Sequence, residues 1–341
     1  MSITIAAANA LHYAPEIKEL FLAHERPEFP DYFDRAYPRA FANGATSWLG
    51  RDPHGRLVMH AACLARHFRF GSRDVVGGLL ANVMVAKLYR TFFPARALLD
   101  RLVQDAKAGG VLDFLYADPN VESRSLLYGT RFVTVGTLQR YVLPVGDRRR
   151  YRDLGIRLFH AMLRARPGGG SARRRARVIP HAAGRFQADD FRVPPEQSPR
   201  LAAHHDQALY ESRLQGYPGD HDWWLTCHGD ASPNRAEVAL LVRGPDASGL
   251  ATLHALRWAV APGLPPAAFV PSLIAELRRR RCERLQVTTV AESALGRALR
   301  RCGFIPRPET VPLVALPLTP LGEECTRSVR DWEITDVDCD R

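Results

Sequence analysis

Apolar positions in the first half of the chain follow two alternating periods. Residues 75–85 (VVGGLLANVMV) are apolar at both parities, which predicts a central strand covered on both faces. Residues 87–110 carry apolar side chains at helical spacing and end on two glycines, which predicts a helix with a glycine stop. Residues 111–120 predict another buried strand, 121–132 a short helix and 131–144 a closing strand or hairpin. With two or three antiparallel strands upstream, joined by the turns DPHG and GSRD, this order predicts a mixed α/β unit.

The second half of the chain repeats this order with weaker signals. The predicted elements are strands at 236–244, 250–260, 284–290 and 311–318 and helices at 269–281 and 292–304. Three anchors also recur at a nearly fixed offset. They are Leu127 and Leu299, 172 residues apart, Phe132 and Phe304, also 172 apart, and Pro144 and Pro317, 173 apart. The matching order and spacing predict an internal duplication, with two like domains of mixed, mostly antiparallel sheet flanked by helices.

A basic stretch separates the two halves. Residues 147–186 hold 12 arginines against two aspartates and include RPGGGSARRRARV, where glycine and like charges oppose packing. We therefore expect an N-terminal domain at 1–146, a basic linker at 147–186 and a C-terminal domain at 187–341. Residues 151–166 within the linker predict an amphipathic helix, which either docks on its own domain or contacts an anionic membrane surface.

Composition restricts the classes of function only weakly. The formal net charge is +11, but 44 of the 47 basic residues are arginines and most of the excess lies in the linker. No apolar run is long enough to span a membrane, and the opening residues lack the basic start of a signal peptide. Six cysteines form no CxxC pair and the histidines no HxxxH pair, which predicts free thiols, a reducing cytoplasm and no metal site.

A motif at residues 85–95 introduces candidate chemistry. Val85, Tyr89, Arg90 and Ala95 match the pattern V-x-P-x-Y-R-x-x-G-x-G/A, while Phe93 and the residue in the proline position depart from it. On this motif the chain resembles the GCN5-related N-acetyltransferase (GNAT) superfamily, over residues 45–145 well and 235–340 weakly. The tandem arrangement is similar to that of FemAB-type proteins and of acetyltransferase-like proteins in bacterial polysaccharide clusters.

The resemblance implies an acyl-coenzyme A site. In the family this loop turns into a helix N-terminus, where backbone amides and the helix dipole hold the pyrophosphate. Phe93 would crowd the phosphate where the family has glycine, and Arg90 and Arg96 would compensate through side-chain contacts. The cofactor-binding residues implied are Val83, Met84, Val85, Arg90, Thr91, Phe93, Ala95, Arg96 and Asn120. Of these, the backbone at residues 83–85 would polarise the thioester carbonyl.

A second family motif, N-x-x-A-x-x-L-Y-x-x-x-G-F, matches from Asn120 to Phe132. In the family its tyrosine protonates the departing thiolate. Leu127 occupies that position here, and Tyr128 lies one residue later, about 100° further round a helix. Tyr128 is therefore either the general acid or a packing residue.

The predicted strand at 75–85 carries no acidic residue that could act as a base. Deprotonation of the acceptor would fall to Asp118, Glu122, His60 or water. Each of the three side chains has a purely structural role as its alternative.

Three functions follow from these residues. The first is an acyltransferase that moves an acyl group, such as acetyl, from acyl-CoA to an amine or hydroxyl of a small-molecule or sugar acceptor. The second is a FemAB-like transferase that uses aminoacyl-tRNA, although no basic strand interleaved with aromatics supports a nucleic-acid partner. The third is a non-catalytic scaffold with two degenerate copies of the fold.

The second half offers few residues for chemistry. His221, Trp223 and Trp224 are candidates for stacking on a sugar or nucleotide-sugar, or they anchor a strand. The phosphate loop is missing there and Leu299 stands in the tyrosine position, so we expect no cofactor in this half. The final segment, 331–341, predicts a closing strand with Trp332 packed.

Overall fold

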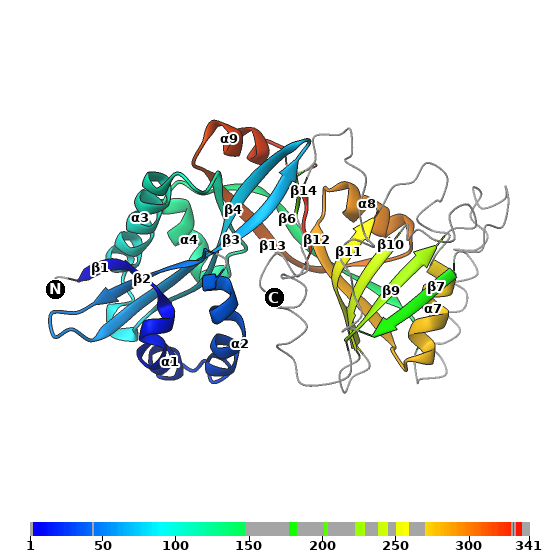
Figure 1. The fold of residues 1–341 in the computed structure, drawn as a ribbon, viewed down its shortest axis with the longest axis horizontal. Helices are drawn as coiled ribbons and strands as arrows, with labels where there is room; N and C mark the ends of the chain where they lie inside the picture. Colours follow the sequence, from blue (N-terminus) through cyan, green and yellow to red (C-terminus); the bar gives the residue numbers. More distant parts are fainter. Residues whose placement is uncertain are drawn as a thin grey trace.

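The computed structural model describes residues 3–42, 44–146, 177–182, 201–203, 222–228, 238–244, 250–258, 270–328, 330 and 332–335. Within these residues the strands join in one continuous sheet, in the order β1-β2-β3-β4-β5-β13-β6-β12-β11-β10-β9-β7, with β8 and β14 attached beside β3. Helices cover the sheet in two lobes (Figure 1). The predicted mixed α/β class is confirmed.

The first half contains both the predicted elements and two helices that precede them. Its elements are β1 (Thr4–Ala8), η1 (Ala10–Tyr13), α1 (Ala14–Leu22), α2 (Phe29–Ala42), β2 (Thr46–Arg51), β3 (Leu57–Phe70), β4 (Arg73–Val85), η2 (Lys87–Tyr89), α3 (Phe92–Gly109), β5 (Phe114–Ala117), α4 (Val121–Gly129) and β6 (Val133–Pro144). Gly110 ends α3 in the left-handed conformation, with φ 64°, as a glycine stop requires.

In the described part of the second half, an order found in the first half recurs among the strands and helices. They are β7 (Arg177–Ala182), β8 (Leu201–Ala203), β9 (Asp222–His228), β10 (Val238–Arg243), β11 (Leu250–Trp258), α7 (Val270–Arg279), β12 (Arg284–Val290), α8 (Ala294–Arg301), β13 (Ile305–Pro317), α9 (Pro320–Thr326) and β14 (Trp332–Glu333). The pairs α3 and α7, β5 and β12, α4 and α8, and β6 and β13 follow one another in the same order.

Backbone irregularities recur at the offset that the sequence anchors share. β4 has one residue more than β3 beside Asn82, and β11 has one residue more than β10 at His254, 172 positions later. Arg131 after α4 and Gly303 after α8, also 172 apart, both have positive φ, 72° and 88°. These bulges and helix ends support the interpretation of the chain as an internal duplication.

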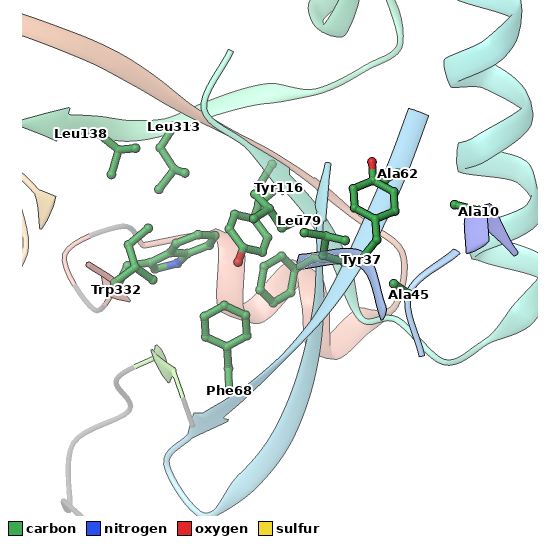
Figure 2. Packing of buried hydrophobic residues seen from close by; sticks show 14 of the residues in the cluster. Ala10, Tyr37, Ala45, Ala62, Phe68, Leu79, Tyr116, Leu138, Leu313 and Trp332 are labelled. Atoms are coloured by element: carbon green, nitrogen blue, oxygen red, sulfur yellow. The ribbon is translucent and has the colours of Figure 1, made fainter. Parts of the chain in front are cut away.

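The last strand of each half pairs with strands of the other half. β13 lies between β5 and β6, antiparallel to both, and β6 pairs with β12 as well as β13. After β13 the chain returns to the first half, where Trp332 lies fully buried against Tyr116 (Figure 2). Its ring also contacts that of Phe114, with centroids 5.5 Å apart. Neither half therefore completes its sheet or its core from its own residues.

Two faces of the first half's sheet are covered, as the apolar pattern predicts. Leu79 and Met84 of β4 pack with the helices α1 and α2, while Leu80 and Val85 pack with α3 and α4. Both helix pairs are visible on opposite sides of β3 and β4 in Figure 1. Four cysteines, Cys63, Cys282, Cys302 and Cys325, are buried free thiols, as predicted.

One predicted segment differs in the structure. Arg177–Ala182, inside the predicted linker, forms β7, which pairs antiparallel with β9. The glycines and arginines before this segment predicted an unpacked linker, whereas pairing with β9 stabilises residues 177–182 as a short strand. Of the predicted closing strand at 331–341, the structure describes residues 332–335, where Trp332–Glu333 forms β14 and Trp332 is packed as expected; the other residues of this segment lie outside the described ones.

Some predictions concern residues that the structure does not describe. The predicted helix at 151–166 and the residue His221 lie outside the described residues, whereas Trp223 and Trp224 belong to β9. Among the described helices, none is both long and apolar enough to cross a membrane.

Candidate functional site

The strands β4 and β5 diverge at the centre of the first half. They pair in parallel only from Gly77 to Leu79 on β4 and from Phe114 to Tyr116 on β5. A side chain at Gly77 would come within 2.7 Å of the Phe114 ring, so glycine permits the strands to meet there. Beyond Leu79, β4 continues to Val85 along β3, while β5 ends at Ala117. We call this divergence, between residues 80–85 of β4 and the end of β5, the β4–β5 fork.

A bulge in β4 lies inside the fork. His60 pairs with Met84 and Ala62 with Ala81, so β4 carries one extra residue between these pairs. Asn82 at this point has φ 53°, a conformation that asparagine tolerates better than most residues. The Asn82 carbonyl lies 2.9 Å from His60 Nδ1, and its side-chain amide donates to the Tyr32 hydroxyl at 3.4 Å.

After β4 the chain passes through η2 into the N-terminus of α3. Thr91 is the N-cap residue, and its side chain makes no capping hydrogen bond. The first amides of a helix have no partner within the helix, so such an end favours an anion. Phe93 is 80% exposed, so most of it faces solvent and is not packed into the core. Pro94 at the third helical position offers no N–H.

A buried carboxylate holds the turn in place. Tyr89 of η2 donates its hydroxyl hydrogen bond to Asp52 Oδ2 at 3.2 Å. Burial opposes ionisation of Asp52, but hydrogen bonds from the Arg56 side chain and from the amides of Arg56 and His54 outweigh it and lower its pKa to about 2. The ionised Asp52 thus ties the turn to the β2–β3 hairpin.

The two arginines expected to contact phosphate have partners within the protein. Arg90 Nε donates to the Val85 carbonyl at 2.9 Å. Arg96 Nε donates to both oxygens of Asp100, at 3.1 and 3.0 Å. Burial, together with the charges of Arg90 and Lys87, lowers the pKa of His24, which follows α1. The contacts of Arg90 and Arg96 each use Nε, so a phosphate would bind either arginine through its remaining N–H donors or by exchange with these partners.

Beyond β5, α4 carries the other predicted residues. Asn120 caps this helix and its Oδ1 accepts hydrogen bonds from the Ser123 amide and hydroxyl, both at 2.8 Å. Glu122 is exposed in the first turn, and Asp118 lies half-buried just after β5. Because the carboxyl ends of parallel strands share one edge, Asp118 and Asn120 lie at the same end of the sheet as residues 83–85.

Leu127 and Tyr128 have different surroundings. Leu127, in the family's tyrosine position, is buried with the α3 side chains Leu98 and Leu102. The Tyr128 side chain is 42% exposed, and its hydroxyl lies 2.7 Å from Thr134 Oγ1 on β6. The one-residue shift seen in the sequence therefore places the Leu127 side chain in the core and the Tyr128 ring at the protein surface.

His60, one of the candidate bases, is fully buried in the core. Its Nδ1 faces the Asn82 carbonyl and its Nε2 lies 3.3 Å from Ser47 Oγ. Burial lowers its pKa to about 4, so the imidazole is neutral near pH 7. This environment favours the structural alternative for His60 over that of a base.

Sequence reasoning missed the bulge at Asn82. The available signal was chemical, because Asn82 is the one polar side chain in residues 75–85 and asparagine is enriched at positive φ. In the part of the chain that the structure describes, no cluster of three or more histidine, cysteine or acidic residues could hold a metal.

Comparison with known proteins rests on solved structures. No protein-family model and no curated protein matches the chain. A GCN5-related N-acetyltransferase from Kribbella flavida is similar over 95% of this chain and 74% of its own, with a TM-score of 0.63 and 11% identity. A GCN5-related N-acetyltransferase from Anabaena variabilis is similar over 94% of this chain and 74% of its own, with a TM-score of 0.62 and 10% identity.

A tandem GNAT protein from the clavulanic acid biosynthesis pathway is also similar. It matches 94% of this chain and 99% of its own, with a TM-score of 0.52 and 11% identity. The chain therefore has the GNAT acetyltransferase fold in two copies. At 10–11% sequence identity, the similarity to these structures shows the fold of this chain and not its activity.

Proposed function

We propose that the first half binds an acyl-CoA, with acetyl-CoA as the simplest donor, and transfers its acyl group to an amine or hydroxyl of a small-molecule or sugar acceptor. One observation carries this proposal: β4 leads from the β4–β5 fork, through η2, to the N-terminus of α3, where the N-cap Thr91 provides no side-chain cap. The pantetheine arm would lie in the fork and the pyrophosphate at the helix end.

The reaction would need few protein side chains. The acceptor nitrogen or oxygen attacks the thioester carbonyl carbon, the C–S bond breaks, and coenzyme A leaves as its thiol. Backbone amides of residues 83–85 would stabilise the developing oxyanion. The acceptor's proton would pass to Asp118, Glu122 or water, and the sulfur would gain a proton from Tyr128 or water. Neutral, buried His60 takes no part in this proton transfer.

The Tyr128 hydroxyl is the side-chain acid that the fold supports best. Tyr128 is 42% exposed although its hydroxyl is hydrogen-bonded to Thr134, so the hydroxyl could donate a proton to the sulfur of a bound thioester. Tyr128→Phe tests this role, because it removes the hydroxyl and retains the ring. We expect kcat to fall at least tenfold with KM nearly unchanged; an equal kcat would assign the proton to water.

A second candidate function, the non-catalytic scaffold, is favoured by the internal partners of Arg90 and Arg96. Calorimetric titration separates it from the transferase. If the helix end holds the pyrophosphate, acetyl-CoA binds at least 100-fold more tightly than S-acetylpantetheine, which lacks the diphosphate and nucleotide. An absence of binding at millimolar acetyl-CoA would overturn the proposed function and leave the scaffold.

A further inference from the structure

The bulge in β4 reverses which side chains face each side of the sheet. Before it, Leu79 and Ala81 face the core under α1 and α2, and Leu80 faces α3 and α4. After it, the even-numbered Met84 faces α1 and α2, and Val85 faces α3 and α4. One extra residue in a strand produces this change of parity. The bulge therefore fixes the orientation of residues 83–85.

The same change orients the backbone groups at the end of β4. The Ala86 amide donates to the Val58 carbonyl of β3 at 2.8 Å. Because backbone groups alternate along a strand, the Val85 amide and carbonyl point to the opposite edge, into the β4–β5 fork. The Val85 carbonyl is the group that Arg90 Nε contacts there. A loss of the bulge would turn these groups away from the fork.

His60 holds the bulge from inside the core. Its Nδ1 lies 2.9 Å from the Asn82 carbonyl, which can only accept, so Nδ1 carries the hydrogen. Its Nε2 then accepts from the Ser47 hydroxyl. The Phe21 ring contacts the imidazole at its edge, with centroids 5.7 Å apart, and the Tyr37 ring lies 5.9 Å away. The imidazole is thus fixed in one tautomer and one orientation.

We propose that His60 is a positioning residue for the acyl-donor site: its Nδ1–H holds the Asn82 carbonyl, which keeps β4 bulged and directs the backbone of residues 83–85 into the β4–β5 fork. This inference rests on the proposed function for its consequence in catalysis. The mechanical part, in which His60 holds the bulge, stands on the geometry alone.

Two substitutions at His60 separate its two nitrogens. The side-chain amide of His60→Asn places an N–H donor where Nδ1 lies, whereas that of His60→Gln reaches the Nε2 position and leaves the Asn82 carbonyl without its donor. Ser47→Ala serves as the matched control, because it removes the partner of Nε2 and leaves Asn82 untouched. All three are measured in the full chain, with melting temperatures recorded alongside.

We expect His60→Gln to raise the Kd for acetyl-CoA and lower kcat, each at least tenfold, while KM for the acceptor stays within twofold. His60→Asn and Ser47→Ala should keep both values within threefold of wild type. Hydrogen exchange of the amides of residues 83–85 should accelerate at least tenfold in His60→Gln alone. The ¹⁵N spectrum of the wild-type imidazole should show the Nδ1–H tautomer.

The proposal would be overturned if His60→Asn and His60→Gln lost affinity for acetyl-CoA and kcat equally, to an extent that follows the drop in their melting temperatures. His60 would then be a packing residue. An Nε2–H tautomer would also overturn it. If wild-type protein binds no acetyl-CoA, the proposed function fails, while the exchange rates and the tautomer still decide whether His60 holds the bulge.

Discussion

Arg131 occupies a backbone conformation that suits glycine. It follows α4 with φ 72°, and its counterpart in the second half, Gly303, follows α8 with φ 88°. In both places the next residue donates its amide to a leucine carbonyl of the helix, Phe132 to Leu127 at 3.3 Å and Phe304 to Leu299 at 3.0 Å. A side chain in this region costs about 1–2 kcal/mol relative to glycine.

Replacement of Arg131 by glycine should therefore stabilise the protein. We expect Arg131→Gly to raise the free energy of unfolding by up to about 1 kcal/mol, because the relief of strain exceeds the added chain entropy of the unfolded state. Arg131→Ala keeps the strain and controls for the lost charge. Gly303→Ala should be destabilising. Denaturant midpoints measure all three, and a less stable Arg131→Gly would show that the arginine side chain itself stabilises the helix end.

His60 should give the stability a pH dependence. Burial lowers its pKa from 6.5 to about 4 in the folded protein, so folding favours the neutral form. The stability that neutral His60 gives the folded state is fully present above pH 6.5. As the pH falls from 6.5 through 4, the free energy of unfolding drops by about 3 kcal/mol in total. His24, with its lowered pKa, acts in the same direction. The free energy of unfolding, measured by denaturation at several pH values, should therefore fall more steeply between pH 6.5 and 4 in wild type than in His60→Asn. An equal fall in both would contradict this.

At the scale of elements, periodicity predicted where strands and helices lie but not how β4 is bent. The segment 75–85 is apolar at both parities, so a bulge that exchanges the two faces leaves no trace in the pattern. The strand at 284–290 was predicted with the bounds of β12. The helices α1 and α2 were not predicted, since prolines such as Pro38 interrupt the signal that their buried aromatic side chains provide.

The candidate site was predicted in its elements and not in its contacts. The motif at 85–95 located the turn into α3, because a helix N-terminus after a strand can be recognised from sequence. Arg96 pairs with Asp100 four residues later on α3, a spacing that the sequence contains, whereas the contact of Tyr128 with Thr134 of β6 depends on side-chain geometry that no spacing encodes. Whether acyl-CoA displaces them stays a prediction.

At the scale of the whole molecule, the duplication could be predicted and the exchange of strands could not. Recurrent anchors 172 residues apart indicated two copies, but periodicity does not say which strand a closing strand joins. In the structure β6 and β13 each pair across the halves, and α9 joins the first half where Thr319 Oγ1 donates to Asp113 at 2.9 Å.

The exchange predicts that the halves do not fold independently. A fragment of residues 1–146 lacks β13 beside β5 and lacks Trp332 against Phe114, so we expect it to be unfolded or aggregated when expressed alone. The full chain should unfold in one transition, with coincident curves from circular dichroism and tryptophan fluorescence. A soluble, cooperatively folded fragment would contradict the role of the exchanged strands.

The central claim is that the N-terminus of α3 binds the pyrophosphate of an acyl-CoA, and the most direct test is calorimetric titration of acetyl-CoA into a pair of N-cap variants. Thr91→Asp adds a carboxylate that caps the helix and interacts favourably with its dipole, while repelling a phosphate; Thr91→Asn caps it without charge. We predict that Thr91→Asp is more stable than wild type by about 0.5–1 kcal/mol, with a Kd for acetyl-CoA at least tenfold higher, and that Thr91→Asn binds within threefold of wild type. Undiminished binding by Thr91→Asp would contradict the account.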